Sequence, residues 1–157
     1  MDRPARVRYI MNTKEEARES AHSPALVAKS NFYAQNQLRF KELVDASVNE
    51  TIVRLLGKDG SQSFFTHLRD ESGIPRDMVA QRLDVLFLTL DHVFGVASRT
   101  VGVAIMRNLY RTLGLKFAEN PDHNLSDHVE EALFDYVREI TALSAPKTVR
   151  QRTETPR

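Results

Sequence analysis

Helical spacing of the apolar side chains is the feature that most constrains how this chain of 157 residues folds. From Phe40 to about Leu143, apolar residues recur every three or four positions. No part of that stretch sustains the strict alternation that is typical of a half-buried β-strand. Each predicted segment therefore has one apolar face with the period of an α-helix. The sequence predicts an all-α fold, a compact bundle of four to five helices.

Glycine and polar capping residues divide the first half of this stretch. A first helix begins near Phe40 and is expected to end at Gly57, a residue suited to the left-handed conformation at a helix C-terminus. We expect a tight turn at residues 58–60. A short second helix follows, which Ser61 caps and Ser72-Gly73 ends. The sequence thus predicts two separate helices before residue 73.

The second half of the stretch contains three more predicted helices. Pro75 suits the first turn of a third helix, because the N–H that proline lacks has no partner there. This helix, Pro75 to Phe94, is apolar over much of its circumference, so we expect it at the centre of the bundle or at an interface between copies. The remaining helices are predicted from Ala97 to Leu113, with Gly114 at the end, and from Asn124 or Ser126 to about Leu143.

Charge is distributed unevenly, although the formal net charge is only +1. Residues 1–40 carry seven basic and four acidic side chains, and residues 144–157 carry four and one, whereas residues 41–143 carry 11 and 16. The two ends also have few apolar side chains to bury. We therefore divide the chain into a basic N-terminal extension (1–37), partly disordered or helical, a helical bundle (38–143) and a disordered basic tail (144–157).

Several classes of protein are excluded by what the sequence lacks. There is no cysteine, so no disulfide, thiolate nucleophile or cysteine-based zinc site can form. The longest apolar run, Val101 to Met106, is far shorter than the roughly 20 residues of a membrane-spanning helix. The N-terminus carries no apolar stretch of the kind found in secretory signals. We therefore expect a cytoplasmic protein without a membrane segment.

The five histidines form no recognisable catalytic or metal-binding motif. His123 and His128, with Asp122, Asp127 and Glu131 nearby, are the only cluster with the composition of a metal site. Their spacing does not place both rings on one helix face, and His123 precedes the predicted fifth helix. No serine, carboxylate pair or cysteine is arranged beside a histidine in a known catalytic pattern. We therefore expect no catalytic, cofactor-binding or metal-ligating residue, and no enzyme.

The segment from His67 to Leu83 suggests an alternative function. It has the helix, the glycine-containing turn and the second helix of a helix-turn-helix motif, with Gly73 at the turn. Arg76 and Arg82 would then face the groove of DNA. Aspartates on the same predicted helix and the acidic body oppose this hypothesis, because both repel phosphates.

Two more surface features are candidates for partner contacts. Arg99, Arg107 and Arg111 share one row of the predicted fourth helix, which could dock an acidic partner or nucleic acid but more often pairs with neighbouring acids. Val85 and Leu88 lie outside the main apolar face of the predicted third helix. They must be covered by the fifth helix, by the N-terminal segment or by a second copy of the chain, so a homodimer is one of the alternatives.

The ends of the third and fourth predicted helices carry a family resemblance. Phe94-Gly95 ends one predicted helix, and Leu109-Tyr110 and Leu113-Gly114-Leu115 end the next. With these residues, the stretch from Leu90 to Phe117 resembles the small archaeal helical domain called the Nitrosopumilus output domain. The resemblance extends over roughly residues 40–117. It implies an output module of signalling or regulatory proteins that acts through protein contacts and has no established catalytic residues.

Two hypotheses about function follow. The first is a non-enzymatic, intracellular interaction or signal-output module, of archaeal origin by the resemblance, with a protein partner. The alternative is a DNA-associated transcriptional regulator that uses segment 67–83 and the basic tails. No cofactor is expected in either case.

Overall fold

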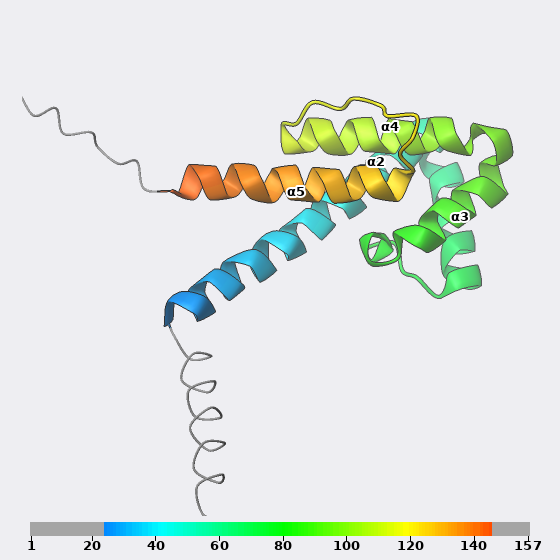
Figure 1. Cartoon of the computed structure of the whole chain (residues 1–157). Coiled ribbons are helices and arrows are strands. Elements are labelled where there is room, and N and C mark those ends of the chain that lie inside the picture. Colours follow the sequence, from blue (N-terminus) through cyan, green and yellow to red (C-terminus); the bar gives the residue numbers. More distant parts are fainter. Residues whose placement is uncertain (1–23, 146–157) are drawn as a thin grey trace, which may run out of the picture. The chain divides into compact units, whose positions relative to one another are not determined.

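The computed structural model describes residues 24–145, and within them the chain is helical and contains no strand (Figure 1). The expected all-α class is therefore confirmed. None of the helices in this range is both long and apolar enough to cross a membrane. Predictions for residues 1–23 and 146–157 lie outside the described residues. The elements in order are α2 Pro24–Ser72, the 3-10 helix η1 Val79–Gln81, α3 Leu83–Phe94, the 3-10 helix η2 Gly95–Ala97, α4 Ser98–Leu113 and α5 Leu125–Ser144.

The chain divides into two structural units, residues 1–41 and 42–157. The described part of the first unit is the beginning of α2. Its described side chains from Pro24 to Arg39 are exposed or half-buried. The second unit contains the rest of α2 and all the other described elements, and the candidate sites below all belong to it.

The core of the second unit is built from one face of each helix. α3 packs against both α4 and α5, and α4 packs against α5. Burying a large aliphatic or aromatic side chain contributes roughly 1.5–3 kcal/mol, so this set is the main source of stability. The buried apolar side chains of these helices include Val44, Val48, Ile52, Phe64, Phe65 and Leu68 from α2, Leu86 and Leu90 from α3, Val101, Ile105, Met106 and Leu109 from α4, and Val129 and Ala132 from α5.

Helix α2 is interrupted at Gly57, where φ is 71° and ψ is −178°. This positive φ strains any residue with a Cβ, which explains a glycine at the position. The predicted interruption is in the right place, but the tight turn at 58–60 is wrong, because these residues are already helical. Ser61 is not an N-cap either, since its Oγ donates to the carbonyl oxygen of Lys58 at 2.8 Å. The two predicted helices thus follow each other with a single non-helical residue between them.

The predicted start of the third helix at Pro75 is wrong. Residues 75–82 form a turn and the 3-10 helix η1, and α3 begins only at Leu83. Arg82, with φ −138° and ψ 59°, separates η1 from α3. The predicted helix-turn-helix in segment 67–83 therefore lacks its second helix.

Contacts with α2 explain why residues 75–82 are not part of α3. The backbone N–H of Ala80 donates to Asp45 Oδ1 at 2.7 Å, and the neighbouring Val79 is fully buried. A backbone N–H held by a side chain of another helix is not available to its own helix. Asp45 lies 35 residues earlier in the chain, so no local pattern indicates this contact.

Helices α4 and α5 lie side by side and run in the same direction, because the segment after Gly114 returns along α4 before α5 begins (Figure 1). The predicted boundaries are confirmed here. Gly114, with φ 73°, ends α4, and Asn124 caps α5. The cap is reciprocal, since Asp127 N donates to Asn124 Oδ1 at 3.0 Å and Asn124 N donates to Asp127 Oδ2 at 2.9 Å.

Candidate functional site

Arg76 and Arg82, the predicted DNA contacts, both bind side chains of their own chain. The Arg76 guanidinium donates two hydrogen bonds to Asn49 Oδ1 and lies 4.6 Å from the centroid of the Phe65 ring. Arg82 donates to both carboxylate oxygens of Asp84, at 3.1 and 3.0 Å. This hydrogen-bonded pair raises the pKa of Arg82 and lowers that of Asp84. The two arginines therefore do not project together from one recognition helix.

The arginine row of α4 is divided between two places. Arg99 and Arg107 line a shallow depression of about 430 Å³, to which α2 contributes Arg54. Arg99 also lies 3.4 Å from Glu119. Arg111 is not among the lining residues and instead pairs with Glu50 of α2 at 3.6 Å. Two of the three predicted arginines thus pair with acids, as the sequence favours.

Val85 and Leu88 lie together on a groove between α2 and α3. Leu88 is 69% exposed, in the middle of α3, and Val85 one turn earlier is half-buried. The groove has a volume of about 530 Å³. We call it the α2–α3 groove, and it is lined by His67, Glu71, Ser72, Val85, Leu88, Thr89, Asp91 and His92. Its two histidine rings stack across it, with their centroids 6.1 Å apart and an interplanar angle of 19°.

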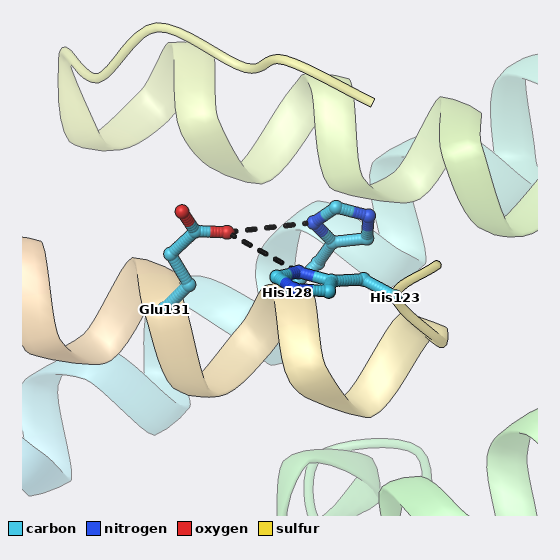
Figure 2. Close-up of side chains that lie close together, drawn as sticks. All are labelled: His123, His128 and Glu131. Carbon is cyan, nitrogen blue, oxygen red and sulfur yellow. Dashed lines mark ion pairs between the residues drawn. The ribbon is translucent and has the colours of Figure 1, made fainter. Parts of the chain in front are cut away.

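The structure also brings together two histidines that the sequence separates (Figure 2). His123 comes from the segment before α5, His128 from the first turn of α5, and Glu131 from the next turn. Glu131 Oε2 lies 3.6 Å from His128 Nδ1 and 3.9 Å from His123 Nδ1. The two ring centroids are 5.3 Å apart. We call these three residues the His–His–Glu cluster.

His128 is held firmly in this cluster. Its side chain is only 3% exposed, and the ring of Phe117 packs edge-on against it with 5.3 Å between centroids. The Tyr110 hydroxyl donates to the His128 carbonyl oxygen at 2.9 Å, which ties α4 to the first turn of α5. Burial, followed by the nearby carboxylates of Glu131 and Asp135, raises the pKa of Tyr110 to about 12. This hydroxyl therefore stays a donor far above neutral pH.

The ring nitrogens that face Glu131 accept or donate no hydrogen bond within residues 24–145. Nδ1 of His123 and Nδ1 of His128 are both buried, and neither has a hydrogen-bond partner among the described residues. An unsatisfied buried polar atom costs roughly 1–3 kcal/mol, and such atoms in native proteins call for a specific explanation. The described protein groups thus leave both nitrogens available to a further partner.

The cluster forms part of the wall of a cavity of about 470 Å³ between α3, α4 and the start of α5. His123 and His128 both line this cavity. Three acidic side chains, Asp84 and Asp91 of α3 and Glu119 of the segment before α5, share the wall with Arg99. Asp84 is paired with Arg82 and Glu119 with Arg99, so Asp91 gives the wall a small excess of negative charge, which favours a cationic occupant over an anionic one.

The composition of this cluster is visible in the sequence, although no metal ligand is expected there. A comparison of helix faces does not reveal that a loop residue can fold back over the first turn of the following helix. One local signal is present: His128 and Glu131 are three residues apart, a spacing that places both on the same side of a helix. The position of His123 depends on how the loop folds, and no spacing rule predicts it.

Comparisons of the chain with protein-family models, with curated proteins and with solved structures found no match. The resemblance to the Nitrosopumilus output domain therefore stays a prediction.

Proposed function

We propose that this chain is a non-enzymatic, intracellular interaction module, a helical bundle of the Nitrosopumilus output domain type that works by binding protein. The observation that carries the proposal is the exposure of Leu88 in the α2–α3 groove. A leucine with most of its surface in water, next to a half-buried valine, gains free energy when a partner covers both.

The surroundings of these two residues support a protein contact. His67, Glu71, Asp91 and His92 line the same groove as Val85 and Leu88. Protein interfaces typically combine an apolar centre with a polar rim of this kind. The groove thus offers apolar area for affinity and charged side chains for selection of a partner.

The occupant that we propose is a second copy of the chain. A two-fold symmetric contact uses the same patch on both subunits, so one patch must supply both the protruding group and the recess that receives it. Here Leu88 protrudes from α3 and the groove beside it contains the less exposed Val85. Each copy can therefore insert its Leu88 into the groove of the other.

Sedimentation equilibrium tests this proposal. We expect the chain, whose monomer mass is 17.9 kDa, to show a mass that rises toward twice this value with increasing concentration. Leu88→Ser should shift the equilibrium toward the monomer, because it removes the apolar group at the centre of the contact. Val85→Ser should act in the same direction with a smaller effect, since this side chain is already half-buried.

Leu143→Ser is the matched control, because Leu143 is a comparably exposed leucine, at 85%, near the end of α5 and away from the groove. It should leave the equilibrium unchanged. A wild-type chain that stays monomeric up to about 100 µM, a weak limit for a specific protein contact, contradicts the proposal. Equal losses in Leu88→Ser and Leu143→Ser contradict it as well.

A further inference from the structure

We propose that His123, His128 and Glu131 bind a divalent transition-metal ion, with zinc as the best fit. None of these three residues lines the α2–α3 groove, although Leu88 and Asp91 of that groove also line the cavity beside the cluster. Three features of the cluster support the metal site: the donor atoms, their separations and the residues that hold them.

The donor set is typical of zinc. Imidazole nitrogen is the most common protein ligand of transition metals, and two histidines with one glutamate form one of the known three-residue zinc sites. Magnesium and calcium prefer all-oxygen coordination, which a site with two nitrogen donors does not offer. The chemistry of the cluster therefore selects a transition metal over the alkaline-earth ions.

The separations fit a shared ion better than a hydrogen-bonded cluster. One donor atom from each residue lies within 4.8 Å of the other two. The distances from Glu131 Oε2 to the two Nδ1 atoms, 3.6 and 3.9 Å, are too long for hydrogen bonds. Donors at 2.0–2.1 Å from a tetrahedral zinc ion lie roughly 3.3 Å apart, so modest side-chain movements complete the geometry.

The unpartnered nitrogens are an independent indication. Both Nδ1 atoms are buried without a hydrogen-bond partner in the described part of the chain, and His128 is almost fully enclosed. Figure 2 shows both rings turned toward the Glu131 carboxylate. A metal ion bound between them would satisfy both nitrogens and the carboxylate at once.

The surrounding residues prepare the site. Tyr110 and Phe117 fix the backbone and ring of His128, so this ligand needs no rearrangement. Asp127 is occupied by the reciprocal cap with Asn124, which leaves Glu131 as the carboxylate that faces the rings. The Glu131 side chain is 51% exposed and therefore free to adjust as the ion enters.

Three protein ligands leave one position of a tetrahedral ion for water or another small ligand. Because His123 and His128 line the cavity of about 470 Å³, that position is reachable from the cavity. The acidic residues in the cavity wall also favour the approach of a cation. The site that we infer is thus an accessible one, in contrast to a closed structural zinc site with four protein ligands.

Titration of the full chain with Co²⁺ and Zn²⁺ tests the inference. The protein carries no added histidine tag and is first freed of metal by a chelator. We expect one Co²⁺ per chain, with the visible absorption of a tetrahedral cobalt complex, and displacement of Co²⁺ by Zn²⁺. Zn²⁺ should also raise the melting temperature, since an ion that binds only the folded chain stabilises it.

The variants are His123→Gln and Glu131→Gln, chosen because both side chains are partly exposed, at 39% and 51%, and tolerate replacement. Each should lower the Zn²⁺ affinity by at least the roughly ten- to hundredfold that follows loss of a supporting residue at a metal site. His92→Gln is the matched control, an exposed histidine of the α2–α3 groove. It should keep the wild-type affinity and cobalt spectrum.

Circular dichroism confirms that each variant remains helical, so that a loss of binding reports on the ligands. The inference is overturned if the wild-type chain binds neither ion at about 1 mM, the weak limit of a specific site. It is also overturned if both ligand variants bind as well as the wild type, or if His92→Gln weakens binding as much as they do. Failure of the proposed dimer leaves all these outcomes unchanged.

Discussion

At the scale of single residues, Gly102 determines how the start of α5 packs on α4. A Cβ atom at this position would overlap Leu125 Cδ1 and would lie 3.1 Å from Leu125 Cγ. Rotation about the Cβ–Cγ bond of Leu125 moves Cδ1 away but leaves Cγ in place, so either the whole Leu125 side chain must change its rotamer or the start of α5 must shift slightly. The intrinsic preference of a helix for alanine over glycine, about 1 kcal/mol, opposes this steric effect.

We predict that Gly102→Ala destabilises the chain by up to about 2 kcal/mol, the cost of overpacking a tight contact after the helix preference is subtracted. In the Leu125→Ala background, where the clash is gone, the same substitution should stabilise the chain by up to about 1 kcal/mol. Urea unfolding of the four proteins measures both effects. The same sign in both backgrounds would show that Leu125 does not limit the approach.

At the scale of elements, Asp45 explains the shape of the segment between α2 and α3. Its carboxylate accepts a hydrogen bond from the Ala80 N–H. Burial raises the pKa of Asp45, and the nearby charge of Asp77 raises it further. Hydrogen bonds from the backbone N–H groups of Ala80 and Val79 act in the opposite direction and lower the pKa. A raised pKa means that folding favours the protonated carboxyl group. The stability that this group contributes is therefore full below pH 3.8, the ordinary value, and is lost as the pH rises through the higher folded value.

Two substitutions separate the hydrogen bond from the charge. Asp45→Asn keeps an oxygen that accepts from Ala80 and removes the charge of this half-buried carboxylate, so at neutral pH this variant should be at least as stable as the wild type. Its advantage should shrink as the pH falls toward 3.8. Asp45→Ala leaves the N–H without its partner and should lose about 1–2 kcal/mol. Thermal unfolding at several pH values measures the stability of the three proteins, and a less stable Asp45→Asn at neutral pH would contradict this role of the half-buried charge.

The same segment shows which elements the sequence predicts and which it does not. Gly73, Gly114 and Asn124 end or begin helices as expected, because a positive φ or a capping side chain acts within a few residues. Pro75 carries an equally good local signal for a helix start. The contact between Asp45 and Ala80, which only the folded chain brings about, prevents that helix from forming.

The candidate sites follow the same rule. Val85 and Leu88 are predictable because surplus apolar residues on a helix are visible in its periodicity, and both line the α2–α3 groove. The His–His–Glu cluster is not predictable in this way, because the position of His123 next to His128 depends on the fold of a loop, and a loop has no repeating spacing of side chains. Pairings within one helix are readable from spacing, whereas pairings across a loop depend on tertiary structure.

At the scale of the whole molecule, the predicted ends of the helical bundle lie close to the first buried side chain and to the last helical residue of the described part of the chain. The predicted bundle, residues 38–143, begins just before Phe40, the first buried side chain among the described residues. It ends beside Ser144, the last residue of α5. The described side chains that precede Phe40 are all exposed or half-buried. The stability of the chain should therefore reside in residues 38–145.

A truncated chain of residues 38–145 should accordingly melt at nearly the same temperature as the full chain. The deleted part of α2 buries no described side chain fully, and an isolated helix of about 14 residues is only marginally stable in water. A chain that begins at Ser47 is the control, because it also loses the buried Phe40 and Val44, and burial of each contributes roughly 1.5–3 kcal/mol. This second truncation should melt well below the first.

Amide hydrogen exchange adds a local test in the full chain: amides of residues 24–37 should exchange fast and those around Val48 and Ile52 slowly. Strong protection of residues 24–37, or a melting temperature that falls as far in the first truncation as in the second, would place part of the stable body before residue 38.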